Sequence, residues 1–397
     1  MNVKVLLADK TLIGKTLMEN MAVIYDSHIL SVVPVHEVDE NLKALSLDPK
    51  EIEKKFFEGI LSPGFIDVHV HGSAGVDVMD GDVDSLKRLS RALAEQGVTS
   101  FLATTISSDK ADVHQALDVV GQLMDSEATS DMGAKVIGAH LEGPFLNPEK
   151  AGAHDPRFLM APSSDFIEGM THIIRLITYA PELDVNQVFM KWIRQNAPHI
   201  KLSMGHTNAT FEEAIQAINL GIDSTTHLFN AMTGLHHREP GVVGAVLSTD
   251  VYTEIIADGV HVHKGALETA YKAKGDDRMI LITDAMCAAC MRPGTYKLGG
   301  LDVTTDGKSA RLSNGTLAGS VLTQQAAVRH MHKEVGVPLE SALYMAASVP
   351  AQMIEEDKSG RIESGLKADF VLLNHTLEVV ETIVDGRIVF GGNVCES

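Results

Sequence analysis

Between residues 60 and 285, short apolar stretches alternate with longer segments, several of which carry an apolar residue every three or four positions. The apolar stretches are typical of buried β-strands and the periodic segments of amphipathic helices. Two of the periodic segments, 84–97 and 211–221, end in glycine, as helices often do. The strand candidates, in chain order, are residues 64–70, 98–105, 135–141, 173–180, 200–205, 222–228, 252–258 and 279–284.

Eight strand–helix units in this length predict an α/β fold of the TIM (β/α)8 barrel type. The alternative is an open, doubly wound sheet, which gathers its ligands at one switch point between two strands. Polar residues with metal-binding side chains follow five of the predicted strands here, which favours the closed barrel.

The two ends of the chain differ from this middle part. Both are rich in short β-type runs, and the Asp385-Gly386 pair predicts a tight turn between two of them. We therefore expect one small β-sandwich domain built from both termini. The predicted division is residues 1–60 and 356–397 for the β-sandwich and 61–355 for the barrel.

The segment that follows the eighth predicted strand has little helical character. Residues 285–320 are punctuated by glycine and proline, which predicts a hairpin or lid over the barrel mouth. Residues 323–336 and 339–352 then predict helices.

Composition narrows the class of protein. The chain has 397 residues, 45% of them apolar, which suits a large barrel with an appendage. We expect no membrane span, because the apolar runs are only as long as strands. No secretory signal is visible at Met1, and the three cysteines, Cys287, Cys290 and Cys395, are too few for a disulfide framework. These features predict a cytoplasmic protein.

The formal net charge is −20, and no cluster of lysine and arginine stands out. Nucleic acid is therefore not expected as a partner. An anionic substrate would need a local basic pocket to overcome the unfavourable background.

Five strand-like segments lead into residues that bind metals. These residues are His69 and His71, Glu142, His206, His227 and Asp284. Taken singly, each residue could instead have a structural role, such as a helix cap or a salt-bridge partner. Because the carboxyl ends of barrel strands meet at one mouth, the set together predicts a metal centre.

The residue types suggest distinct roles. Side chains two apart on a strand point the same way, so His69 and His71 can share one ion. One glutamate with two histidines is typical of a catalytic divalent metal that keeps an open position for water. A carboxylate beside such a water, Asp284, suits a general base.

Loops after the third, sixth and seventh predicted strands carry further polar residues. Arginine and histidine side chains in such loops can bind phosphate through charge-assisted hydrogen bonds. The candidates are His154, Asn230, Ala231, Arg238 and His261. No second cysteine pair accompanies Cys287 and Cys290, and these two residues follow the predicted barrel. We therefore do not expect them to form a redox or zinc motif.

Several longer motifs, taken in order, resemble the N-acetylglucosamine-6-phosphate deacetylases of the amidohydrolase superfamily. The resemblance covers residues 60 to 320, and the flanking β segments fit the small sandwich domain of that family. The motifs are PGFIDVHVHG, GAHLEGPFLNPEKAGAH, MGHTNAT, THLFNAM, REPG, ADGVH, ITDAM and LAGS. One position departs, because Ala151 stands where many members carry lysine.

The resemblance implies a metal-dependent hydrolysis of N-acetyl-D-glucosamine 6-phosphate to D-glucosamine 6-phosphate and acetate. It implies Glu142, His206 and His227 as ligands of the essential ion and His69 and His71 as ligands of a second. The metal is a divalent ion, Zn, Fe, Mn or Co, with one or two ions per subunit.

The resemblance also implies roles around the substrate. Asp284 is the implied acid and base, and His154 helps to polarise the acetyl carbonyl. The implied substrate contacts are Ala153, His154, Asn230, Ala231, Arg238, His261, Leu317, Ala318 and Gly319. Arg238 is expected to serve the neighbouring subunit of a homodimer.

Two alternative functions are also compatible with the sequence. The first is a related amidohydrolase that acts on N-acetylgalactosamine 6-phosphate or on an N-acyl amino acid. The sequence does not reveal which configuration of one sugar hydroxyl the protein recognises. A catalytically silent binding protein on the same fold would be expected to lack the ligands or Asp284, and all of them are present.

Overall fold

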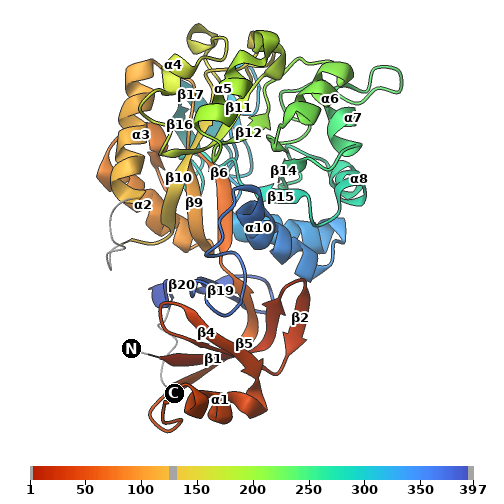
Figure 1. Cartoon of the computed structure of the whole chain (residues 1–397). Helices are drawn as coiled ribbons and strands as arrows, with labels where there is room; N and C mark the ends of the chain where they lie inside the picture. The colour runs from red at the N-terminus through yellow and green to blue at the C-terminus, as the bar shows by residue number, and fades with distance from the viewer. Residues whose placement is uncertain (1–2, 125–131, 392–397) are drawn as a thin grey trace.

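A parallel β-barrel surrounded by helices forms the larger part of the molecule (Figure 1). The computed structural model describes residues 3–124 and 132–391, so Cys395 lies outside the described residues. Within these ranges, eight parallel strands follow one another in chain order around the barrel. They are β6 (Phe65–Val70), β9 (Val98–Thr105), β10 (Lys135–Glu142), β11 (Ile174–Tyr179), β12 (Lys201–Met204), β13 (Ser224–Thr225), β14 (Tyr252–Ile256) and β15 (Met279–Ile282).

Hydrogen bonds between β6 and the end of β15 close the barrel. The Asp284 N–H donates to the His69 carbonyl at 2.9 Å, and the His71 N–H donates to the Ala285 carbonyl at 2.9 Å. The Thr283 hydroxyl adds a hydrogen bond of 2.6 Å to the buried Asp67 carboxylate. This closure confirms the barrel and excludes the open doubly wound sheet.

The strand predictions agree with the structure except in length at β13. Residues 222–228 were expected to be extended, but only Ser224–Thr225 pair with both neighbours. The chain leaves the extended conformation at His227, where φ is +30°, and at Phe229, where φ is +80°. The turn therefore begins at a candidate ligand, which places its side chain at the rim.

Amphipathic helices cover the barrel. Helix α2 begins at an Asp82 side chain that caps the Ser85 N–H, and it buries Leu86, Leu89 and Leu93. Fully burying one such leucine stabilises the fold by roughly 1.5–3 kcal/mol. The barrel helices are α2 (Val83–Ala94), α3 (Lys110–Met124), α4 (Ser164–Ile167), α5 (Val188–Asn196), α6 (Phe211–Leu220), α7 (Gly241–Leu247), α8 (Lys264–Lys274), α9 (Gln324–His330) and α10 (Leu339–Met353).

Both ends of the chain enter one smaller sheet, below the barrel in Figure 1. Its strands are β1 (Lys4–Ile13), β2 (Thr16–Glu19), β3 (Met21–Tyr25), β4 (Ile29–Pro34), β5 (Glu53–Pro63), β19 (Phe370–Leu373), β20 (Val379–Val384) and β21 (Arg387–Phe390), and α1 (Val38–Ala44) packs beside them. Strand β5 joins the two ends, because it pairs parallel with β1 and antiparallel with β19. The strands are hydrogen-bonded into a single continuous sheet, and β5 runs on through Gly64 into the first barrel strand.

The predicted hairpin after the barrel is present as three antiparallel strands. They are β16 (Gly294–Leu298), β17 (Leu301–Thr305) and β18 (Ala310–Leu312). Leu298 and Val303 pack with Met286 and Ile106 in a separate apolar cluster beside the barrel mouth. A shorter hairpin, β7 (Gly72–Ser73) and β8 (Val76–Asp77), follows the first barrel strand.

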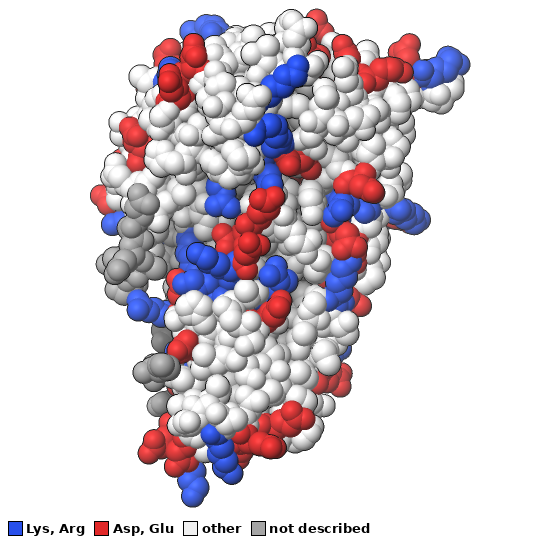
Figure 2. Space-filling model, in the orientation of Figure 1, with Lys and Arg blue, Asp and Glu red and all other residues white. Residues whose placement is uncertain are grey.

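Charged side chains of both signs are interspersed over the face shown in Figure 2. At the junction of the two sheets, Lys135 of β10 pairs with Asp369 at 3.1 Å and with Asp385 at 2.8 Å. These ion pairs tie the barrel to the small sheet. Across residues 3–124 and 132–391, no helix is both long enough and apolar enough to cross a membrane.

We predict that Gly386→Ala destabilises the small sheet. Asp385 and Gly386 form the predicted turn with positive φ at both positions, and a Cβ on Gly386 would lie 1.7 Å from the Asp26 carbonyl oxygen. The expected loss in the free energy of unfolding, measured by denaturant titration, is about 1–3 kcal/mol. Gly365→Ala is the control, because its φ is also positive but its Cβ would meet no atom within 4 Å. An equal loss in both variants would contradict the steric argument.

Candidate active site

The six predicted metal-type residues converge at the carboxyl ends of the barrel strands. Their ligand atoms form two groups, each with all atoms within 4.8 Å of one another. The groups are His69, His71 and Asp284, and Glu142, His206 and His227. All six side chains are largely buried, so they face one another inside the mouth and not the surrounding water.

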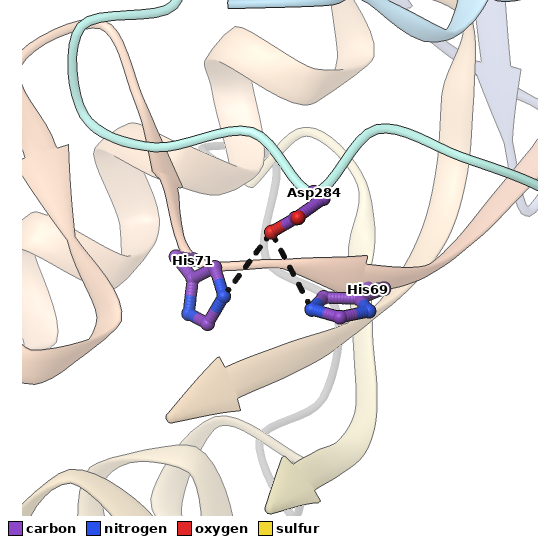
Figure 3. Close-up of side chains that lie close together, drawn as sticks. All are labelled: His69, His71 and Asp284. Carbon is purple, nitrogen blue, oxygen red and sulfur yellow. Dashed lines mark ion pairs between the residues drawn. The ribbon is translucent and has the colours of Figure 1, made fainter. Parts of the chain in front are cut away.

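In the first group, one carboxylate oxygen faces two imidazoles, as Figure 3 shows. Asp284 Oδ1 lies 3.3 Å from His71 Nε2 and 3.5 Å from His69 Nε2. The two histidines leave β6 on the same side, as their spacing predicts. Asp284 has a φ of +48°, an uncommon conformation for a residue with a side chain, and it is stabilised here by the backbone bonds that close the barrel.

In the second group, Glu142 at the end of β10 meets two histidines. Its Oε1 lies 3.2 Å from His206 Nε2 and 3.1 Å from His227 Nε2. The two imidazole nitrogens are 3.0 Å apart. Three ligand atoms therefore converge on one point, and the three residues also line the cavity at the barrel mouth.

Glu142 also connects the two groups. Its second oxygen, Oε2, lies 3.1 Å from His71 Nε2 and 3.5 Å from His69 Nε2. One carboxylate thus presents a different oxygen to each group, which is the arrangement that lets a carboxylate bridge two ions. The sequence could not place the two oxygens of Glu142.

Two of the histidines have partners that orient the imidazole ring. The His206 Nδ1–H donates to the Lys150 carbonyl oxygen at 2.8 Å, and the His69 Nδ1–H donates to Glu254 Oε2 at 3.0 Å. In each ring the proton on Nδ1 leaves the Nε2 lone pair free to face the site. Such contacts are typical of metal-binding histidines.

The acidic and imidazole groups shift one another's pKa values. Burial alone would raise the pKa of Glu142, but the surrounding histidines, His69 first, hold it well below its usual range. Burial would lower the pKa of His71, but its hydrogen bonds to Asp284 and Glu142 raise it to about 9. Against the effect of burial, His69 and His71 also lower the pKa of Asp284. The ionised carboxylates therefore attract positive charge, either protons or a cation, to one point.

This donor set fits a divalent cation. His69 Nε2 is buried and has no hydrogen-bond partner among the described residues, although two carboxylate oxygens lie near it. A buried polar atom without a partner is unusual and calls for an explanation such as a bound ion. Imidazole nitrogens with carboxylate oxygens accept several divalent transition metals.

His154 lies at the edge of the metal groups with a defined tautomer. The Ser107 N–H donates to His154 Nδ1 at 3.3 Å, so the ring proton of the neutral imidazole is on Nε2. That nitrogen lies 3.4 Å from Glu142 Oε2. Burial lowers the pKa of His154 to about 4, which keeps the ring neutral and able to donate its Nε2–H into the site.

A cavity of about 340 Å³ opens above the two groups. Seven of the predicted substrate residues line it within the described part of the chain: Ala153, His154, Asn230, Ala231, His261, Leu317 and Gly319. Asp258 accepts the His261 Nδ1–H at 2.7 Å and so holds that ring in place. Lys150 is the one lysine or arginine among the described lining residues.

Two of the predicted contacts, Ala318 and Arg238, are absent from the described lining of the cavity. The Ala318 side chain is fully buried in the apolar cluster under β16–β18, and its N–H donates to the Ala310 carbonyl. Arg238 is exposed, contacts His237 at 2.8 Å, and is absent from the described lining of the cavity. Within one subunit, Arg238 therefore does not join the other candidates.

Cys287 and Cys290 are both free thiols. Cys287 is buried beside Lys297, and burial raises its pKa to about 11. A thiol with a raised pKa is a poor nucleophile at neutral pH.

Sequence reasoning missed several residues that the structure brings into the site, among them Lys150, Ser107 and Glu254. Lys150 lines the cavity, while Ser107 and Glu254 orient His154 and His69. Only Glu254 left a signal, because a carboxylate within the apolar stretch Tyr252–Ile256 has to find a partner inside the barrel.

Comparison with known proteins identifies the family to which these site residues point. The amidohydrolase family matches residues 60–389. N-acetylglucosamine-6-phosphate deacetylase of Bacillus subtilis (strain 168) is 36% identical over 94% of this chain and 97% of its own length. N-acetylgalactosamine-6-phosphate deacetylase of Escherichia coli O157:H7 is also 36% identical, over 91% of this chain and 95% of its own.

Solved structures agree with these relatives. N-acetylglucosamine-6-phosphate deacetylase from Pasteurella multocida superposes with a TM-score of 0.88 at 31% identity, covering 97% of this chain and 99% of its own. A mutant of the Mycobacterium smegmatis enzyme in complex with N-acetyl-D-glucosamine-6-phosphate gives a TM-score of 0.88 at 27% identity, covering 98% and 100%. The chain therefore belongs to the amidohydrolase family and, within it, to the N-acetylglucosamine-6-phosphate deacetylases.

Proposed function

We propose that this protein hydrolyses N-acetyl-D-glucosamine 6-phosphate to D-glucosamine 6-phosphate and acetate in amino-sugar catabolism. The observation that carries the proposal is the pair of ligand groups that share Glu142 at the floor of a cavity of about 340 Å³. The relatives that match nearly the whole chain support the choice of substrate.

Glu142, His206 and His227 would hold the essential ion, and His69 and His71 with Asp284 a second one. A divalent ion, when bound, lowers the pKa of water and polarises a carbonyl, so amide hydrolysis can proceed near neutral pH. The donor set accepts Zn, Fe, Mn or Co.

Asp284 would move the proton. Its carboxylate is ionised because His69 and His71 lower its pKa, so it can accept the proton of the attacking water. Once protonated, it can pass that proton to the departing amine of the sugar. The backbone bonds that close the barrel place this carboxylate at the cavity floor, where both transfers would occur.

His154 would stabilise the negative charge that develops on the acetyl oxygen. Its Nε2–H points into the site because Ser107 occupies Nδ1. A neutral donor that is already oriented stabilises a developing oxyanion without reorganisation during the reaction.

The other end of the cavity would bind the sugar phosphate. Asn230, Ala231 and His261 line it, and Lys150 supplies one positive charge. A second charge would come from Arg238 of a neighbouring subunit, because this side chain is exposed and outside the cavity of its own subunit. The protein would then act as a homodimer. Free thiols fit a reducing compartment, so we place the activity in the cytoplasm.

N-acetylgalactosamine 6-phosphate is the second candidate substrate. The observation that favours it is the Escherichia coli relative, which is as similar to this chain as the Bacillus subtilis one. The two sugars differ in one hydroxyl group, and the same metal groups would serve both.

Comparing the two sugar phosphates tests this choice. We expect acetate release from both, with kcat/KM higher for N-acetylglucosamine 6-phosphate by about tenfold or more, since one misplaced hydrogen bond costs roughly 1–3 kcal/mol. A higher kcat/KM for the galactose isomer would reverse the assignment of substrate but not of reaction.

The Asp284→Asn variant tests the proton-transfer role. We expect kcat to fall by about 10²–10⁴-fold, because general acid–base catalysis contributes that much. Asp302→Asn, an exposed carboxylate on β17, is the control and should keep wild-type activity. Turnover of Asp284→Asn close to that of wild type, at equal metal content, would rule the role out.

The Arg238→Ala variant tests the shared phosphate site. Loss of a charge-assisted bond of roughly 1.5–3 kcal/mol should raise KM for the phosphorylated sugar about 10- to 100-fold, with no change for unphosphorylated N-acetylglucosamine.

Heterodimers extend this test to the subunit interface. Co-expressing Arg238→Ala with Asp284→Asn subunits should restore a low KM, because a site with intact Asp284 then receives Arg238 from the other subunit. Failure to restore the low KM in verified heterodimers would place Arg238 outside the neighbouring site. Arg292→Ala serves as a control for removing an exposed arginine.

A further inference from the structure

A buried carboxylate that belongs to neither ligand group contacts both of them. Glu254 lies on β14 with its side chain inside the barrel and fully buried. Its Oε2 accepts the His69 Nδ1–H at 3.0 Å and the backbone N–H of His227 at 3.4 Å. It therefore touches one member of each group without being placed as a ligand itself.

The contact with Glu254 determines how His69 meets the site. With its proton on Nδ1, the ring presents the Nε2 lone pair to the point between Asp284 and Glu142, whose oxygens each lie 3.5 Å away. The His140 ring packs edge-on against it at a centroid distance of 4.5 Å. His71 Nδ1 has no hydrogen-bond partner among the described residues. Of the two histidines in the first group, only His69 therefore has its ring oriented by a hydrogen bond at Nδ1.

The charges around Glu254 favour cations. Every ion pair that the described residues form with Glu142, Asp284 or Glu254 is to a histidine. A buried carboxylate is costly unless positive charge compensates it. Glu254 is a third carboxylate next to His69, within hydrogen-bond distance of its Nδ1.

We propose that Glu254 is a positioning residue that makes His69 a competent ligand and thereby decides whether a second divalent ion binds. The first ion, on Glu142, His206 and His227, depends less on Glu254. The contact of Glu254 with that group is one longer hydrogen bond, from the backbone N–H of His227. The proposal rests on the ligand assignment under the proposed function but not on the identity of the substrate.

Zinc binding to the metal-free protein tests this without any activity measurement. The full chain is stripped with chelator, titrated with Zn²⁺ and analysed for bound metal per subunit. We expect two equivalents for wild type, and a second equivalent about 10- to 100-fold weaker in Glu254→Ala, as is typical when a partner of a ligand is removed. Glu254→Gln keeps an oxygen that accepts the His69 proton, so its loss should be smaller.

Two further variants separate positioning from a general structural effect. Glu381→Gln neutralises another buried carboxylate, which pairs with Lys55 in the small sheet, and it should retain both equivalents. His69→Ala should lose the second equivalent, and the double variant His69→Ala/Glu254→Ala should lose no more than His69→Ala does. Additive losses would mean that Glu254 acts independently of His69.

Three further results would overturn the proposal. They are a wild type that binds one equivalent at saturating zinc, a Glu254→Ala variant whose second equivalent is unchanged, and a Glu254→Ala variant that loses the first equivalent equally. Circular dichroism of each metal-free variant checks the fold, and Glu254→Gln carries the test if Glu254→Ala does not fold. Acetate release is measured separately, so two zinc equivalents without deacetylation would reject the proposed function alone.

Discussion

The backbone hydrogen bonds that join the first barrel strand to the end of the last one are the constraint on which the site depends. The His69 carbonyl accepts the Asp284 N–H, and the Ala285 carbonyl accepts the His71 N–H. The same bonds that close the sheet therefore bring the two histidines to within 3.5 Å of the carboxylate that would move the proton. The fold and the site therefore share these contacts.

Electrostatic coupling inside the mouth follows from this closure. Burial opposes the ionised forms of Glu142 and His71, yet their proximity stabilises both charges together. Glu142 is central, because each of its oxygens faces a different group. The site therefore favours positive charge at the point where its carboxylates and imidazoles converge.

The elements outside the barrel complete the cavity. Leu298 of β16 and Leu317 beyond β18 form part of its wall, and the loop after β10 contributes the Lys150 side chain. That loop also accepts the His206 proton through the Lys150 carbonyl, so it links the substrate end of the cavity to a ligand. The small sheet is tied to the opposite part of the barrel by Lys135 and supports the site only indirectly.

The sequence by itself determined the eight strands and the convergence of Glu142, His206 and Asp284, because parallel strands in a closed barrel present all their carboxyl ends at one rim. Only the tertiary structure decided the role of Glu254, whose position on β14 is indistinguishable locally from that of any buried acid needing a partner. It also decided that the Ala318 side chain is buried in the core. Loop paths and cross-strand contacts depend on residues far apart in the chain, and hydrophobic periodicity carries no information about those distances.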